Sequence, residues 1–558
     1  MLWHKAKNVV RFAGLAPHFR IVTTQKRTRT YSMGEASAPK RRSASPEQWT
    51  YGVAKNGNTM KINLTKIERD ICDLLNNVSD YISSQRPELP RIEARIAGGW
   101  VRDKLLGDQC HDLDVAVNSM MGYEFATYIN EYLKSVGAPT KGIAKIESNP
   151  AKSKHLETAT TRLYGLEVDF ANLRTEVYDE NSRIPSQITF GTPKEDAYRR
   201  DITINSLFYN VDTRKVEDFT EKGLEDLQAG LIRTPLPPYE TFKDDPLRVL
   251  RCVRFASRFS FELVDELAEA AKNPTISEAL NSKISRERIL TEVEKMITGP
   301  SPLKAVQLLY SLNLYNIVFQ PPALVSGSIA DPRRAVHAVG AAEWLIKHVA
   351  DFQTTSSSDI RLIYYSACAL PFLNGTSEQK GKQVPAVQIM LRDSLKAPNA
   401  DVTNISTVFK GIPMFQQAAN DNTSQPVSRS ELGMIIRDMG ARWESTLKVA
   451  CIDELLQKLP SIAWDKPDEI DDAAAQEIVV KYVNLHKKAI EYDITKCYEW
   501  KYLINGKKVA ELLGIKPGPI LADILKTLMI WQLDHPNGTE EECTKMLKSY
   551  WQQKQRNQ

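Results

Sequence analysis

The pattern of apolar and polar positions divides the chain into an N-terminal part of mixed character and a longer helical part. Apolar side chains at helical spacing predict helices over 61–85 and 121–136. Short apolar or alternating runs, which are typical of strands, lie at 92–97, 112–117, 142–147, 155–164 and 166–172. Beyond Pro302 the pattern predicts helices at 303–312, 333–350, 359–370, 386–395, 430–458 and 472–490.

Alternation within the run at 112–117 separates two kinds of side chain. Because successive side chains of a strand point to opposite faces, Leu113 and Val115 are expected to face a core. Asp112 and Asp114 then share the other face, and neighbouring carboxylates of this kind suit a hard cation such as Mg²⁺. Asp169, in the run at 166–172, is a candidate third carboxylate on a neighbouring strand. A solvated strand residue is the alternative for Asp169.

Gly98 and Gly99 end the run at 92–97 and precede a short helical turn from Trp100 to Leu106. Glycines let backbone N–H groups approach an anion closely, and a helix N-terminus favours negative charge. A phosphate-binding turn followed by a carboxylate pair indicates a nucleotidyl-transfer site. Each half alone has simpler readings, since two glycines often form only a tight turn. An Asp-x-Asp pair often lies at a solvated strand edge, and some glycosyltransferases use one to bind Mn²⁺.

Taken together, Gly98-Gly-Trp-Val-Arg-Asp103 and His111-Asp-Leu-Asp-Val-Ala-Val117 resemble the signature of polymerase-β-like nucleotidyltransferases, in the branch of tRNA nucleotidyltransferases and poly(A) polymerases. Arg199-Arg-Asp-Ile-Thr-Ile-Asn205 resembles the second signature of this family, here expected on a helix that begins near Glu195. The resemblance implies catalytic roles for Asp112, Asp114 and Asp169, with the first two as ligands in a two-metal Mg²⁺ site. The nucleotide-binding residues that it implies are Gly98, Gly99, Arg102, Asp103, Arg199, Arg200, Asp201, Asn205, Asp245, Arg248 and Arg251.

Asp245 and Arg248 resemble the motif by which class II enzymes of this family select the incoming base. Cytosine and adenine both offer an amine donor beside an unprotonated ring nitrogen, so a carboxylate can accept from the amine while a guanidinium donates to the nitrogen. Guanine and uracil invert both groups. Asp245 also precedes Pro246 at a helix start, so a simple helix-capping role is the compatible alternative.

The expected fold class is α+β, with a polymerase-β-like head that contains a small mixed or antiparallel sheet, followed by all-α neck, body and tail. Residues 178–194 are expected to form a mobile loop over the site. The expected division is 1–50 presequence and basic segment, 51–220 catalytic head, 221–300 neck with the base-selecting helix, 301–460 body and 461–558 tRNA-binding tail.

Charge is concentrated at the start of the chain. Residues 1–50 carry a net charge of +8 while the whole chain carries +4, which leaves −4 for the remainder. Any nucleic acid must therefore be bound by local basic patches. Candidate RNA-binding residues are Lys507, Lys508 and Lys516, which flank the free N-terminus of a helix that Lys516-Pro-Gly-Pro519 is expected to open, after a helix that ends at Gly514. An ordinary helix-turn-helix corner is the alternative.

The first 32 residues are rich in Lys and Arg, contain no acidic residue and include apolar positions, which is typical of a mitochondrial presequence. A start at Met33 would omit it and supply the cytoplasm and nucleus. No apolar run approaches the ~20 residues that span a bilayer. Seven scattered cysteines indicate neither a zinc site nor a disulfide framework.

These features predict an enzyme resembling class II CCA-adding tRNA nucleotidyltransferases, with tRNA, CTP and ATP as substrates and Mg²⁺ as cofactor. A monomer is favoured. The alternatives are a poly(A) polymerase of the same branch and, from another class, a non-catalytic tRNA-binding protein. The glycosyltransferase reading leaves the Arg199 and Asp245 motifs unexplained.

Overall fold

The structure is a computed structural model that describes residues 61–110, 112–146, 158–178, 185–354, 356–470 and 473–556. The predicted presequence and the start at Met33 lie outside these residues. The chain forms two compact units. The first runs to Arg248 and includes Phe261–Ile276, and the second comprises Val249–Ser260 and Ser277 onward. No helix in the described residues is both long and apolar enough to cross a bilayer.

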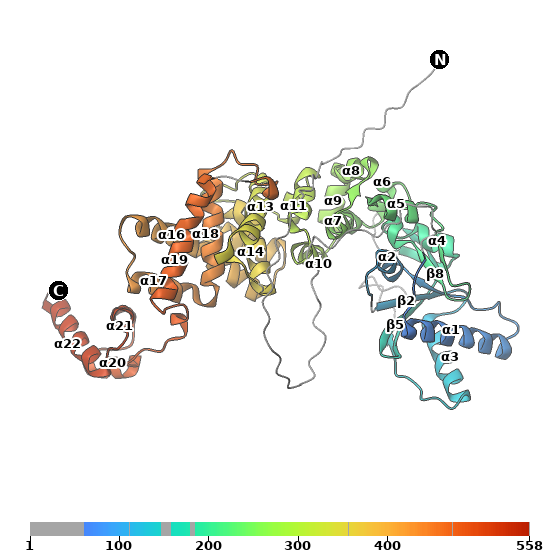
Figure 1. The fold of residues 1–558 in the computed structure, drawn as a ribbon, viewed down its shortest axis with the longest axis horizontal. Coiled ribbons are helices and arrows are strands. Elements are labelled where there is room, and N and C mark those ends of the chain that lie inside the picture. The colour runs from blue at the N-terminus through green and yellow to red at the C-terminus, as the bar shows by residue number, and fades with distance from the viewer. Residues whose placement is uncertain are drawn as a thin grey trace, which may run out of the picture. The chain divides into compact units, whose positions relative to one another are not determined.

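A seven-stranded sheet forms the centre of the first unit (Figure 1). In spatial order its strands are β3 (Ile143–Ile146), β4 (Thr158–Leu163), β5 (Leu166–Asn172), β2 (Asp112–Val117), β1 (Ala94–Ala97), β8 (Phe208–Asn210) and β9 (Lys215–Glu217). Strands β2 and β5 pair in parallel, and the other neighbours are antiparallel. The predicted strands and the mixed sheet of an α+β head are confirmed.

Two amphipathic helices cover the apolar face of this sheet, α1 (Lys66–Gln85) and α3 (Gly122–Ser135). Helix α3 packs on β4 and β5, and α1 packs on α3 and β1. Leu113 and Val115 are buried beneath them, as the alternation of β2 predicts. Gly122 allows the close approach of α3, because a Cβ there would lie 2.2 Å from the carbonyl oxygen of Phe170.

Helix α1 is anchored at its start by a buried carboxylate, Glu68. Thr65 and Glu68 form a capping box, which satisfies backbone N–H groups at the helix start. The Glu68 carboxylate also pairs with the Lys104 amine at 2.8 Å and accepts from the Trp100 indole N–H at 3.3 Å. One side chain thus joins α1 to α2 (Gly99–Leu105), the short helix after the glycine pair.

The structure corrects two predictions beside the site. Residues 174–178 and 185–190 form strands β6 (Arg174–Tyr178) and β7 (Pro185–Phe190), which pair antiparallel, so 185–190 of the predicted loop form a strand, and 179–184 lie outside the described residues. Helix α4 (Pro193–Tyr198) ends before the Arg199 motif, and a 3₁₀ turn (Thr203–Asn205) follows. A helix continuing through the motif was wrong because β-branched residues crowd this segment.

The second unit is helical, apart from a hairpin of β12 (Thr376–Gln379) and β13 (Lys382–Pro385). Its central helix is α18 (Trp443–Lys458), which packs against α13 (Arg333–His348), α14 (Ser357–Ala369), α16 (Asn399–Ser424) and α19 (Ala473–Glu491). The sequence pattern missed α16, whose apolar residues are interrupted by polar ones and by Pro413. The predicted helix 430–458 is two helices, α17 (Arg429–Met439) and α18, separated at Gly440 with φ +57°.

The chain ends in three helices, α20 (Gly506–Leu513), α21 (Pro519–Asp534) and α22 (Glu540–Arg556), drawn in red in Figure 1. They share a small core of Ile504, Val509, Ile524, Leu528, Cys543 and Leu547. Gly514 ends α20 in the left-handed conformation and Pro519 begins α21, as predicted. The predicted five-part division of the chain stays a prediction.

Candidate active site

Four carboxylates, those of Asp112, Asp114, Glu167 and Asp169, lie on the polar face of the sheet at the centre of the first unit. The parallel register places Asp114 opposite Asp169 and Asp112 opposite Glu167. Asp112 and Asp114 are exposed and Asp169 is half-buried. The hydroxyl of Thr160, on the next strand, donates a hydrogen bond to Asp169. The neighbouring strand therefore brings a third carboxylate beside the Asp112–Asp114 pair, as the sequence predicted.

Negative charge is concentrated at Asp114. Desolvation by the surrounding protein raises the pKa of this carboxyl group even though its outer face is exposed. The charge of Arg200 acts in the opposite direction, and Asp169 and Asp112 raise the pKa further. A bound cation would relieve this repulsion, because opposite charge favours the ionised carboxylate.

The donor set suits Mg²⁺ rather than a metal enclosed by protein ligands. Within the described ranges, no group of three or more His, Cys, Asp or Glu side chains is arranged to hold a metal ion. Mg²⁺ is usually bound by one or two carboxylates, with waters and substrate phosphates completing its octahedron. Asp112 and Asp114, with Asp169 alongside, fit that pattern of oxygen ligands.

The glycine pair forms the turn between β1 and α2, next to two arginines. Gly98 has φ +69°, and a Cβ there would lie 3.0 Å from Nη1 of Arg200. A Cβ on Gly99 would lie 3.5 Å from Nη2 of Arg102. A side chain at Gly98 would therefore strain the backbone and displace Arg200. This turn brings the first signature against the second.

Hydrogen bonds join the two signatures in the interior. Arg102 Nη1 donates to Asn205 Oδ1, and Asn205 Nδ2 donates to Asp201 Oδ1 at 3.1 Å. Arg102 also pairs with its neighbour Asp103 at 2.6 Å. All four side chains are almost fully buried. These contacts give them a supporting role in shaping the site, and their predicted contact with the nucleotide stays a prediction.

Arg199 and Arg200, at the end of α4, share one buried carboxylate. Asp196 accepts from Arg199 through Oδ1, at 2.5 Å from Nη2, and from Arg200 through Oδ2, at 2.8 Å from Nη2. Glu176 of β6 accepts from Arg199 Nη1 at 3.2 Å. Sequence reasoning missed both carboxylates. The position of Asp196 could have been recognised, because it lies three and four residues before the two arginines, and helical residues at that spacing are neighbours.

The predicted base-selecting residues lie where α7 (Leu247–Phe259) begins. Asp245 Oδ1 accepts from the Leu247 N–H at 3.1 Å, so the capping contact exists. Arg248 is almost fully buried, and its Nη2 donates to the carbonyl of Arg199 at 2.7 Å. This bond connects the start of α7 to the arginine pair. Base selection by Asp245 and Arg248 stays a prediction.

Arg251 lies one turn further along α7 and belongs to the second unit. Its guanidinium is 3.8 Å from Glu292 and lies over the ring of Phe255. Glu292, from α10 (Arg286–Ile297), is buried and also pairs with Arg254 at 2.5 Å. These contacts brace α7 against α10. A direct contact between Arg251 and the nucleotide stays a prediction.

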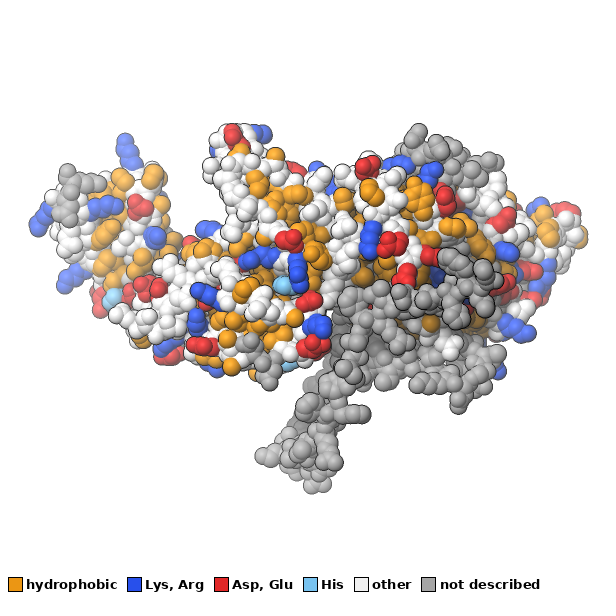
Figure 2. Space-filling model, turned by 90° about the horizontal axis from the view of Figure 1, so that it is seen from above, with side chains coloured by type: hydrophobic (Ala, Val, Ile, Leu, Met, Phe, Trp, Pro, Cys, Tyr) orange, Lys and Arg blue, Asp and Glu red, His pale blue; other side chains and the backbone are white. Residues whose placement is uncertain are grey.

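The three candidate RNA-binding lysines differ in their surroundings. All three are exposed, and Lys508 also forms an ion pair with Glu540 of α22. Figure 2 shows Lys and Arg side chains spread over the C-terminal helices, at the left of the view. Exposed lysines of this kind suit a phosphate backbone, and Lys508 is the least available of the three.

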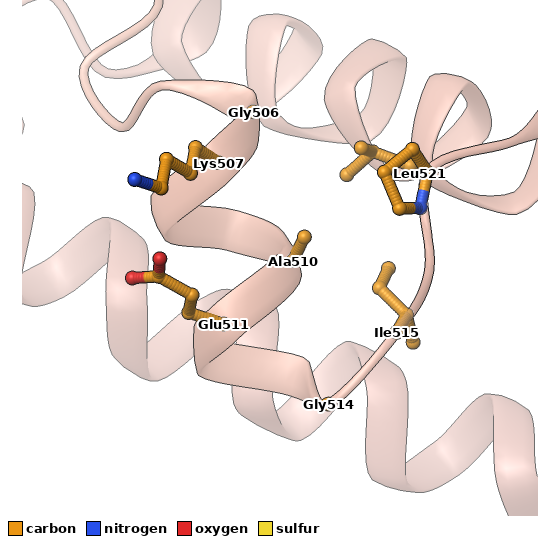
Figure 3. A pocket seen from close by; sticks show the side chains of 8 residues that line it. Gly506, Lys507, Ala510, Glu511, Gly514, Ile515 and Leu521 are labelled. Atoms are coloured by element: carbon orange, nitrogen blue, oxygen red, sulfur yellow. The ribbon is translucent and has the colours of Figure 1, made fainter.

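A pocket of about 420 Å³ lies between α20 and α21. Its lining includes Ala510, Ile515 and Leu521, while the side chains of Lys507 and Glu511 extend to the other side of α20 (Figure 3). The side chains that face this pocket are therefore mainly apolar. The pocket belongs to the second unit.

Comparisons with known proteins agree with this arrangement. The family described as Poly A polymerase head domain matches residues 94–233, and the family described as Probable RNA and SrmB- binding site of polymerase A matches 277–326. The CCA tRNA nucleotidyltransferase, mitochondrial, of Saccharomyces cerevisiae is 38% identical over 525 residues, which are 88% of this chain and 94% of that protein.

Solved structures show the same fold. The Bacillus stearothermophilus CCA-adding enzyme in complex with CTP superposes with a TM-score of 0.57 at 18% identity, covering 89% of this chain and 100% of that one. The Thermotoga maritima CCA-adding enzyme complexed with tRNA has a TM-score of 0.54 at 21% identity, covering 86% and 95%. Because the yeast relative matches nearly end to end, the chain belongs to the CCA tRNA nucleotidyltransferase family and is an enzyme of the nucleotidyltransferase class.

Proposed function

We propose that this enzyme adds C, C and A in turn to the 3′ end of tRNA, from CTP and ATP and without a nucleic-acid template. The observation that carries the proposal is the similarity to the yeast CCA tRNA nucleotidyltransferase over 88% of this chain. The bound tRNA and CTP named for the fold neighbours support the same substrates.

In each addition the 3′-oxygen of the RNA forms a bond to the α-phosphorus of the nucleotide. The bond from that phosphorus to the pyrophosphate oxygen breaks, and the hydroxyl proton passes to solvent. Asp112 and Asp114 would hold Mg²⁺, with Asp169 beside them. Bound Mg²⁺ would supply neutralisation of the triphosphate charge and a lower pKa for the attacking hydroxyl, and two ions would share these tasks.

The remaining residues bind and orient the nucleotide. Arg200 carries positive charge that acts on Asp114, and Arg199 shares the Asp196 carboxylate with it, so both guanidiniums suit the triphosphate. Asp245 would accept from the amine of cytosine or adenine while Arg248 donates to the ring nitrogen. Guanine and uracil would leave these groups unpaired, at a cost of about 1–3 kcal/mol per lost contact. This pairing explains selection of two bases without a template.

Lys507 and Lys516 are proposed contacts for the RNA backbone. Lys508 would contact RNA only after its ion pair with Glu540 breaks, which costs free energy. Such contacts position the substrate without reading its sequence. Since the body of the chain carries a net charge of −4, a small number of local lysines would determine most of the electrostatic attraction to RNA.

The test is incubation with tRNA that ends at the discriminator base, Mg²⁺ and each nucleoside triphosphate separately. We expect two additions from CTP alone, and one further addition when ATP is then supplied. A poly(A) polymerase is the second candidate, because both matching family descriptions name that activity. Long tails from ATP with no use of CTP would establish that candidate instead.

A further inference from the structure

Asp196 occupies an unusual position in the first unit, because its two carboxylate oxygens bind two different arginines. Oδ1 accepts from Nε and Nη2 of Arg199 at 2.9 and 2.5 Å. Oδ2 accepts from Nε and Nη2 of Arg200 at 3.0 and 2.8 Å. Each guanidinium therefore presents two N–H groups to one oxygen, which restricts its orientation.

The local sequence explains this geometry. Thr192 and Glu195 form a capping box and Pro193 occupies the first turn, so α4 begins at a defined residue. Residues three and four positions apart on a helix are neighbours, which brings both arginines over Asp196. Asp196 is 1% exposed. Burial would raise its pKa, but the charges of Arg200 and Arg199 and their hydrogen bonds lower it, so the carboxylate stays ionised.

Two further contacts extend from the arginines toward the rest of the site. Arg200 Nη1 donates to the carbonyl of Asn205 at 3.3 Å and lies against Gly98 in the phosphate-binding turn. The carbonyl of Arg199 accepts from Nη2 of Arg248 at 2.7 Å. A displacement of the arginine pair would therefore change the contacts both at the Gly98 turn and at the start of α7.

We propose that Asp196 is a positioning residue for the incoming nucleotide. It holds the guanidiniums of Arg199 and Arg200 in place for the triphosphate and, through the Arg199 carbonyl, keeps Arg248 in register with the base. Asp196 acts on the nucleotide through these arginines, and its Oδ1 also accepts a longer hydrogen bond from the backbone N–H of Arg174 at 3.4 Å. The inference rests on the proposed function, since it assigns the nucleotide as their ligand.

A merely structural ion pair predicts a different kinetic result. If Asp196 only stabilised the fold, its loss would lower the amount of active enzyme and reduce kcat by the same factor for every nucleotide. KM and the ratios of kcat/KM between nucleotides do not depend on the active fraction. Both quantities therefore separate positioning from stability, even for a partly unfolded variant.

The experiment measures kcat and KM for single additions from CTP, UTP, ATP and GTP with wild type and Asp196→Asn. The substitution keeps the shape of the side chain and removes its charge. We expect kcat/KM for CTP and ATP to fall by about 100-fold, as for a reacting group misplaced by about 1 Å, chiefly through KM. The preference for CTP over UTP and for ATP over GTP should also decrease. Glu217→Gln, which breaks the Arg95 ion pair elsewhere in the sheet, is the matched control and should leave KM and both preferences unchanged.

Wild-type KM and unchanged base preferences in folded Asp196→Asn would overturn the inference. Should that variant fail to fold, Asp196→Glu decides, because it keeps the charge but moves the carboxylate by one methylene. Raised KM with reduced preference in Asp196→Glu supports positioning, and wild-type values overturn it. Failure of wild type to use CTP and ATP on tRNA would instead overturn the proposed function, which the same assay detects separately.

Discussion

Asp114 and Asp169 are distant in the sequence and become neighbours only because β2 and β5 pair in parallel. The alternation of β2 was enough to place Asp112 and Asp114 on one face, since strand geometry has a period of two. It could not show which other strand lies alongside. The raised pKa of Asp114 is a property of the assembled sheet, because desolvation by the surrounding protein is its largest cause and the charges of Asp169 and Asp112 add to it.

At this scale we predict that Asp112→Asn or Asp114→Asn lowers the rate of both C and A addition by about 1000-fold or more. The proposed Mg²⁺ would lose a ligand, and with it several kcal/mol of charge stabilisation. Affinity for tRNA, measured by filter binding or gel shift, should stay close to wild type. Addition of either nucleotide near the wild-type rate would contradict the metal assignment.

A second residue prediction concerns Asp245. Its contact with the Leu247 N–H predicts that Asp245→Ala lowers the free energy of unfolding by about 1 kcal/mol. If Asp245 also selects the base, kcat/KM for UTP and GTP should rise relative to kcat/KM for CTP and ATP in this variant. Thermal unfolding and four-nucleotide kinetics on the same preparation separate the two roles. Loss of stability with unchanged base ratios would leave Asp245 as a helix cap alone.

Among the elements, helix α1 is joined to α2 by one buried carboxylate, that of Glu68. Burial would raise the pKa of Glu68, but hydrogen bonds from Lys104 and Thr65 lower it below the ordinary 4.5. A carboxylate with a lowered pKa stabilises the fold fully above its unfolded pKa and loses that contribution as pH falls through the folded value. The contribution of Glu68 is therefore present at neutral pH and lost in acid.

We accordingly predict that Glu68→Gln lowers the free energy of unfolding at pH 7 by about 3 kcal/mol, since the Lys104 amine is left buried without its partner. Urea titrations of wild type and variant should show the difference between them shrinking below pH 4.5. A difference that is the same at pH 7 and in acid would show that packing, and not charge, accounts for the role of Glu68. Glu93→Gln is a suitable control, because it changes a partly exposed carboxylate that forms an ion pair with Arg95.

For the whole molecule, charge is distributed unevenly along the sequence. Residues 1–50 carry a net charge of +8 and the remainder −4, so the excess of positive charge lies in the first 50 residues. The yeast relative is described as mitochondrial, which supports import as the role of this segment. Its composition suits a presequence, and Met33 would provide a form that lacks it.

We predict that residues 1–32 direct a reporter protein to mitochondria, and that a chain beginning at Met33 has wild-type kcat/KM for CTP and ATP. The control is the same fusion with Arg11, Arg20, Arg27 and Arg29 changed to Gln, which removes charge but keeps length. Fluorescence microscopy and cell fractionation report the outcome. A wild-type fusion that stays in the cytosol would contradict the presequence assignment.

From the sequence alone followed five of the seven strands of the sheet, the glycine turn, the shared face of Asp112 and Asp114 and most helices, because period, turn residues and short motifs are local properties. Tertiary structure decided what depends on contacts between distant segments. The β6–β7 hairpin, the bonds between Arg102 and Asn205 and the pairing of Glu176 with Arg199 belong to this class. The helix α16 was missed because its burial comes from packing on α18 and α19 and not from a clear amphipathic period. Asp196 depends on both the sequence and the tertiary structure. Its spacing of three and four residues to the two arginines is visible in the sequence, but the burial that holds its carboxylate against both guanidiniums comes from the fold.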